Sequence, residues 1–138
     1  MSELTVIQYF GPWVKHPDAT DSRKDSGCNL VAAVNPLLAR YESETGNHIK
    51  VNPATGSIVS GQTFGGFRPQ SCPQGAPHSS HKQGQGVDIY DPDNAFDKWI
   101  TDEILEEFNL YREHPDSTDT WCHLTTRAPG SGHRTFWP

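Results

Sequence analysis

The stretch SSHKQGQGVDI occupies residues 79–89 and places a histidine and an aspartate on either side of two glycines. Gly84 and Gly86 allow the backbone to reverse tightly, and the residues that follow them form a short β-prone run. His81 before such a turn and Asp88 in the strand after it can converge on one cation. Because imidazole and carboxylate groups suit zinc, the stretch predicts a turn, a strand and two metal ligands.

A third ligand is expected from a later strand. Residues 121–125 form a second β-prone run, and His123 lies in its middle, where aromatic packing would fix the direction of the imidazole. Two imidazoles and one carboxylate leave the fourth tetrahedral position for water, which is typical of catalytic zinc sites. The sequence therefore predicts a Zn²⁺ ion held by His81, Asp88 and His123.

The cysteines leave a different zinc site open. The chain has three cysteines without a C-x-x-C pair, so no disulfide framework is expected. Cys72 and Cys122 could instead join His78 and His81 in a mixed structural zinc site. Cys122 beside His123 does not predict a thiol nucleophile, because neighbours on a strand point to opposite faces.

Apolar residues between positions 28 and 44 recur at spacings of three, four and seven, which predicts an amphipathic helix. Gly46 is placed to end this helix. Pro36 lies inside the pattern and predicts either a kink or the start of a second helix. The polar stretch before the helix, residues 16–26, is expected to be a loop.

The rest of the chain is expected to be shorter elements and loops. Residues 4–9 are β-prone and predict an edge strand or an ordered arm, and residues 47–80 predict hairpin turns and long loops. Residues 94–111 predict one bent helix or two short ones, with Asp93 and Thr101 as caps. Together these patterns predict an α+β fold, with a small antiparallel sheet, flanking helices and long loops in one domain over residues 1–138.

Composition excludes several classes of function. The net charge is −6 and no Lys/Arg cluster is present, which argues against nucleic-acid binding. No apolar stretch approaches the length of a membrane span, so no membrane insertion is expected. The first residues lack the basic and apolar regions of a signal peptide, which predicts synthesis in the cytoplasm without one.

These motifs resemble the peptidase M15 family of zinc D-Ala-D-Ala carboxypeptidases, D,D-dipeptidases and L,D-cleaving phage endolysins. The family signature S-x-H-x-x-G-x-A-x-D is matched by Ser79, His81, Gly84 and Asp88. Gly86 stands where alanine is usual. The resemblance implies a hedgehog/D,D-peptidase-like fold, a Zn²⁺ cofactor and hydrolysis of a peptide bond in peptidoglycan stem peptides.

Two further elements extend the resemblance over residues 65–123. A tryptophan two positions before the last histidine is matched by Trp121, and an upstream turn is matched by GGFRP at residues 65–69. The resemblance implies that Arg68 faces the substrate and neutralises the carbonyl oxygen or the carboxylate of the peptide as charge develops. It also implies that Ser79 positions the substrate by hydrogen bonding.

The general base departs from the family pattern. The family places an acidic residue three positions before the last histidine, where this chain has Thr120. Asp119, one residue earlier, is the predicted base, with Glu113 behind it. The alternative is a catalytically weak or inactive protein that binds the cell wall or belongs to a virion and keeps the peptidase fold.

The tail SGHR at residues 131–134 is similar to the closing segment of small phage-encoded members of the family. This similarity implies a phage product that is released by lysis with a holin or is incorporated in the phage particle, with other virion components as possible partners. His133 in this tail and His78 are expected to lie at the surface or behind the ligands.

Overall fold

The computed structural model describes residues 2–138 and has an α+β architecture, as the sequence predicts. Within these residues the sheet has four strands in the order β1-β3-β2-β4. They are β1 (Gly86–Tyr90), β2 (Tyr111–Glu113), β3 (Trp121–Thr125) and β4 (Thr135–Phe136). β3 pairs antiparallel with both β1 and β2, whereas β4 runs parallel to β2. The sheet is therefore mixed rather than antiparallel, because the loop after β3 returns the chain alongside β2 in the same direction.

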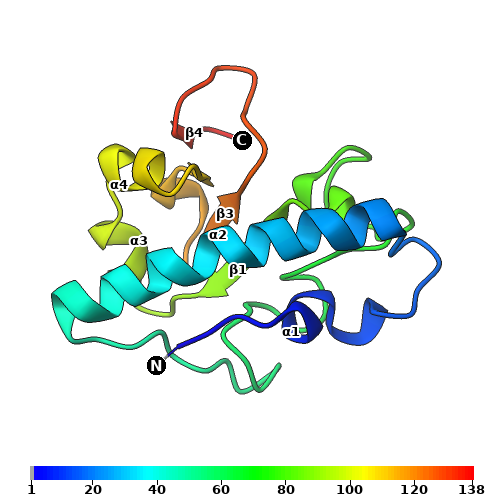
Figure 1. Cartoon of the computed structure of the whole chain (residues 1–138), viewed down its shortest axis with the longest axis horizontal. Helices are drawn as coiled ribbons and strands as arrows, with labels where there is room; N and C mark the ends of the chain where they lie inside the picture. Colours follow the sequence, from blue (N-terminus) through cyan, green and yellow to red (C-terminus); the bar gives the residue numbers. More distant parts are fainter. Residues whose placement is uncertain (1) are drawn as a thin grey trace.

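The helix α2 (Asp21–Thr45) runs the length of the molecule across the sheet (Figure 1). It begins earlier than the apolar pattern predicts, because Thr20 is its N-cap. The Thr20 side chain accepts the backbone N–H of Arg23 and stabilises a first turn made of polar residues. It ends at Gly46, as predicted, and it continues through Pro36 as one helix. Within the described residues, no helix has the length and apolar character needed to span a membrane.

The N-terminal segment is helical, so the predicted strand or arm is wrong. The short helix α1 (Val6–Phe10) starts with a capping box, in which Thr5 and Gln8 each accept the other's backbone N–H. These local hydrogen bonds outweigh the β-propensity of the apolar residues. α1 packs against α2, and its Tyr9 and Phe10 are buried.

Two short helices follow β1, as the second of the two alternatives predicts. They are α3 (Ala95–Trp99) and α4 (Asp102–Glu107), separated where Ile100 is extended. Thr101 caps α4 as predicted. At α3 the Asp93 carboxylate accepts the backbone N–H of Ala95, the first residue of the helix, at 3.3 Å, and the Asp91 carboxylate accepts the N–H groups of Phe96 and Asp97.

The two faces of the sheet have opposite characters. On one face the strand residues are buried with α2 in the hydrophobic core, and they include Val87, Ile89, Cys122 and Leu124. On the other face the alternate residues are polar or aromatic and line a cavity, and they include Asp88, Glu113, Trp121, His123 and Phe136. Polar chemistry is thus gathered on the face away from α2.

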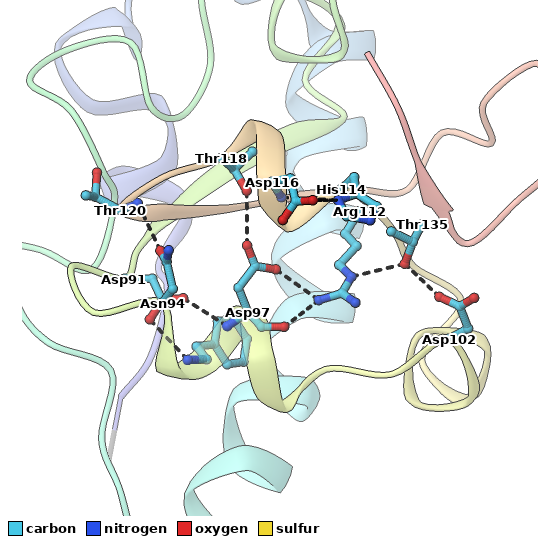
Figure 2. A network of polar contacts seen from close by, with 11 residues as sticks. Asp91, Asn94, Asp97, Asp102, Arg112, His114, Asp116, Thr118, Thr120 and Thr135 are labelled. Atoms are coloured by element: carbon cyan, nitrogen blue, oxygen red, sulfur yellow. Dashed lines mark hydrogen bonds and ion pairs between the residues drawn. The ribbon is translucent and has the colours of Figure 1, made fainter.

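A buried polar network fixes β2 from the core side (Figure 2). Arg112 Nη1 donates to the fully buried carboxylate of Asp97 at 3.0 Å, and the Thr118 hydroxyl donates to the other oxygen at 3.0 Å. Arg112 Nε also donates to Thr135 Oγ1 at 3.1 Å. The network therefore ties α3, β2, β4 and the turn before β3 together, and it leaves the neighbouring Glu113 on the opposite face.

Candidate metal centre

The structure brings the three predicted ligands together. The ligand atoms of His81, Asp88 and His123 all lie within 4.8 Å of one another, and the three side chains are buried. Asp88 Oδ1 is 3.3 Å from His81 Nε2 and 2.8 Å from His123 Nδ1. The three groups are therefore close enough to bind one metal ion.

Two local features position the ligands. His81 lies in a 3₁₀ turn, Ser80–Gln83, which ends at Gly84 in the left-handed conformation with φ 73°. A Cβ at Gly84 would lie 2.5 Å from the Arg23 carbonyl oxygen, so the close contact with α2 requires glycine. Asp88 and His123 are direct partners in the β1–β3 pairing, which explains how residues far apart in the sequence meet.

The outward-facing nitrogen of each imidazole also has a partner. His81 Nδ1 lies 2.8 Å from the Gly66 carbonyl oxygen, a contact that places the proton on Nδ1 and leaves the Nε2 lone pair for a metal. His123 Nε2 lies 3.4 Å from Ser80 Oγ, which leaves Nδ1 directed at the ligand cluster. Such outer partners are typical of histidines that bind metal ions.

Gly86 makes room for this arrangement. A Cβ on Gly86 would lie 2.3 Å from Ser80 Oγ and 3.1 Å from His123 Cε1, both too close for an unstrained contact. The resemblance expects alanine at this position, and the space that its methyl group would fill is occupied in this chain by the Ser80 hydroxyl. Glycine and serine form a complementary pair behind His123.

The buried charges favour the protonation states that bind metal. Burial alone would raise the pKa of Asp88, but the neighbouring His81 and His123 outweigh it and hold that pKa well below its usual range. Burial lowers the pKa of His81, although Asp88 opposes the shift. A carboxylate and a neutral imidazole are the forms in which these groups bind metal.

Arg68 is held beside the ligands. Its Nη2 lies 3.5 Å from Asp88 Oδ2, and its Nε donates to the Phe64 carbonyl oxygen at 2.6 Å. Its backbone N–H donates to the carbonyl oxygen of His81 at 3.1 Å. The guanidinium is therefore fixed at the edge of the site, where the resemblance implies a cation.

The ligands open into a cavity of about 550 Å³ on the polar face of the sheet. Glu113 lines this cavity from β2. Its pKa is raised, because the effect of burial outweighs the opposing effect of the nearby His123. The other side chains of its wall come from the loops and strands around the ligands, and they include Arg68, His78, Ser79, Trp121, Arg127 and Phe136. Ser79 has a local role as well, because its Oγ accepts the His81 backbone N–H at 3.3 Å.

Asp119 lies apart from this cavity. Its side chain is exposed, and its Oδ1 accepts a 3.4 Å hydrogen bond from the Asn94 side chain. The adjacent Thr120 has a φ of 78°, which is rare for a β-branched residue, and its N–H donates to Asn94 Oδ1. Among the described residues that line the cavity, Glu113 is present and neither Asp119 nor Thr120 is.

The cysteines do not join the histidines in a second site. Within residues 2–138 the cluster with ligand geometry is His81, Asp88 and His123. Cys122 is buried on the core face of β3, on the side opposite His123. His78 is exposed at the cavity rim, and His133 is exposed in the turn before β4.

Comparisons of the chain with protein-family models, with curated proteins and with solved structures give no match. The resemblance to zinc peptidases therefore rests on the motifs quoted above.

Proposed function

We propose that the protein is a zinc-dependent hydrolase of peptide bonds in peptidoglycan stem peptides. The observation that carries the proposal is the convergence of His81, Asp88 and His123 in one open cavity that also contains Glu113 and Arg68. The donor set and the cavity support the hydrolytic class, whereas the stem-peptide substrate and a phage source rest on the motif resemblance.

The donor set fits zinc. Two imidazole nitrogens and one carboxylate oxygen are the protein ligands of many catalytic zinc sites, in which a fourth position stays open. When bound, zinc supplies Lewis acidity toward a water molecule and a carbonyl oxygen. The hydrogen bonds from His81 to the Gly66 carbonyl and from His123 to Ser80 would orient the two imidazoles for this ion.

Glu113 is better placed than Asp119 to be the general base. Its carboxylate lines the cavity and its raised pKa lies closer to neutrality, which suits a group that takes and returns a proton. Glu113 would accept the proton of the attacking water as the water oxygen bonds to the carbonyl carbon. The same proton then passes to the leaving nitrogen as the C–N bond breaks, and a carboxylate and an amine are formed.

Arg68 is placed to stabilise the oxygen on which negative charge develops. Its guanidinium lies at the cavity wall and is fixed by Asp88 and the Phe64 carbonyl, so little reorganisation is needed during the reaction. Ser79 lines the same cavity, where its hydroxyl can donate to the substrate while its oxygen accepts the His81 N–H.

The test is clearing of purified bacterial cell walls by the zinc-loaded protein, with and without a chelator. We expect one zinc per chain by elemental analysis, clearing that the chelator abolishes and that added zinc restores. Glu113→Gln should lower the rate by at least about 10²-fold without loss of zinc. Asp119→Asn is the matched control and should change the rate less than about twofold, as expected for a carboxylate outside the cavity. The reverse result would make Asp119 the base, as the sequence predicts.

A second candidate is a wall-binding or virion protein without catalysis. It is favoured by Thr120, which stands where the resemblance expects an acid. Zinc-loaded protein that sediments with cell walls and never clears them would support this candidate and overturn the first.

A further inference from the structure

The cavity over the metal ligands is lined by two arginines whose charges are balanced differently. Arg68 Nη2 lies 3.5 Å from the Asp88 carboxylate, so its charge has a partner within the fold. Arg127 Nη1 instead donates to the carbonyl oxygen of His78 at 2.7 Å, and a carbonyl carries no net charge. Within residues 2–138 the arginines that form ion pairs are Arg40, Arg68 and Arg112. In this part of the chain, Arg127 is therefore a cation of the cavity without a counter-charge.

The fold holds Arg127 beyond the end of β3. This strand begins at Trp121, has His123 at its middle and ends two residues before Arg127, and all three side chains line the cavity. The Arg127 N–H donates to Thr125 Oγ1 at 3.0 Å, and its guanidinium reaches the loop that precedes His81. A guanidinium has five N–H donors, so most of them stay free for a ligand. Along β3, the metal ligand thus lies between an aromatic end and a cationic end of the cavity.

We propose that Arg127 is a specificity-determining residue, which binds a carboxylate of the substrate at a position away from the scissile bond. This inference rests on the proposed function and narrows its substrate class to anionic peptides. A guanidinium can bind a carboxylate through two parallel N–H···O bonds, which are stronger than hydrogen bonds between neutral groups. Because the net charge of −6 gives the protein no general attraction for anions, a local cation is needed to select one.

The role of Arg127 differs from that of Arg68. Arg68 shares its charge with Asp88 beside the metal ligands, where it suits an oxygen on which charge develops during the reaction. The Arg127 side chain is exposed, and it would meet a carboxylate that is charged before, during and after cleavage. Such an interaction is equally strong in the ground state and the transition state, so it should change KM and leave kcat unaltered.

Two synthetic stem peptides with identical termini test this role. The carboxylates within the chain are free in one peptide and converted to amides in the other. We expect the zinc-loaded protein to have a kcat/KM at least about tenfold higher for the acid, through KM, as one charge-assisted hydrogen bond supports. Arg127→Gln keeps a donor for the His78 carbonyl but removes the charge, so it should lose this preference. Arg127→Lys keeps the charge and should retain most of it.

Arg134→Gln is the matched control. The Arg134 guanidinium also donates to a backbone carbonyl, that of Leu110 at 3.2 Å, but it lies outside the cavity lining, so its loss should leave the preference for the acid unchanged. Equal kcat/KM for the two peptides in the parent protein would overturn this inference and leave the hydrolase standing. A preference that survives in Arg127→Gln would do the same.

Calorimetry on the metal-free protein measures binding of the same peptides without cleavage. The acid should bind the parent protein at least about tenfold more tightly than the amide, and Arg127→Gln should bind both alike. If the zinc-loaded protein cleaves neither peptide, the hydrolase fails and calorimetry alone decides the role of Arg127. Equal or absent binding of the two peptides by the parent protein would then overturn this inference as well.

Discussion

Two buried carboxylates lie on opposite faces of the same sheet, and their partners differ in kind. Asp97 on the core face is bound by the Arg112 guanidinium and the Thr118 hydroxyl, both held by the fold (Figure 2). Asp88 on the cavity face is bound by two imidazoles that meet at one oxygen, and the Arg68 guanidinium lies 3.5 Å from its other oxygen. The carboxylate that stabilises the fold is thus paired with groups that always donate hydrogen bonds, whereas the carboxylate of the candidate site is paired with imidazoles that can bind the same metal ion.

Burial alone does not separate the two carboxylates, because both are largely withdrawn from water. Burial raises the pKa of both, but the outcome differs. The imidazoles around Asp88 bring its pKa well below the usual range, whereas Arg112 and Thr118 only partly offset the effect at Asp97, whose pKa is raised. The identity of the partners therefore decides the direction in which the pKa of each carboxylate is shifted.

The largest effect is expected from breaking the core-face pair. Asp97→Ala leaves the Arg112 guanidinium buried without its counter-charge, which should lower the free energy of unfolding by about 3–5 kcal/mol. Urea denaturation measures the change. Asp116→Ala is the control, since that carboxylate is exposed and its loss should cost within about 0.5 kcal/mol. Equal losses in the two variants would mean that the network does not stabilise the fold.

A different effect is expected on the cavity face. Asp88→Ala removes one of three protein ligands, so its zinc affinity should be at least about tenfold lower than that of the parent protein. The same decrease is expected for His81→Ala. Competition with a chromophoric chelator measures the affinity. Metal-free Asp88→Ala should lose less stability than Asp97→Ala, because the Arg68 guanidinium that it leaves lines the open cavity and keeps its hydrogen bond to the Phe64 carbonyl oxygen. Full zinc occupancy in either ligand variant would contradict the assignment.

The fit between Gly86 and Ser80 gives a smaller, reversible effect. Gly86→Ala pushes a methyl group against Ser80 Oγ and His123, and overpacking of this kind costs about 1–3 kcal/mol. Zinc affinity should fall with it, because His123 is displaced. Adding Ser80→Gly creates space for the methyl group and should recover part of the stability. If the double variant is no more stable than Gly86→Ala, the contact with Ser80 is not the cause.

The pH dependence of the metal-free protein should separate the carboxylates by sign. The lowered pKa of Asp88 means that its contribution to stability is lost as the pH falls below its ordinary value, about 3.9. The raised pKa of Asp97 means that the folded state binds the proton more tightly, so its contribution grows as the pH falls toward about 3.9. The free energy of unfolding, measured from pH 7 to pH 3, should therefore fall less steeply with decreasing pH in Asp88→Asn than in the parent protein. In Asp97→Asn it should fall more steeply. The same change of slope in both would refute the contrast.

The sequence predicts the ligand cluster well because its signals are local or strongly spaced. Gly84 and Gly86 mark the turn, and the runs around Asp88 and His123 are long enough to show as strands. The strands β2 and β4 have three and two residues, too few for a period of two to be visible. Glu113 reaches the cavity only through the pairing of β2 with β3, so the sequence names it behind Asp119 and no local pattern places it first.

Local hydrogen bonds account for the errors in the helices. Thr20 extends α2 over polar residues that lack an apolar period, and the Thr5–Gln8 capping box makes a β-prone segment helical. The position of Asp119 also depends on contacts that the sequence does not display. Thr120 has a left-handed backbone, its N–H donates to Asn94, and the Asp119 carboxylate accepts from the same Asn94 side chain outside the cavity.

The pairing of Asp88 with His123 across β1 and β3 also bears on how faithfully the chain folds. A slip of one residue between these strands would turn His123 to the core and bring Cys122 or Leu124 opposite Asp88. An ion that needs all three ligands stabilises only the correctly paired strands, by an amount that grows with the logarithm of the free metal concentration. The free metal concentration during synthesis would then favour the correct register of β1 and β3, so the ion would act on folding before any substrate binds.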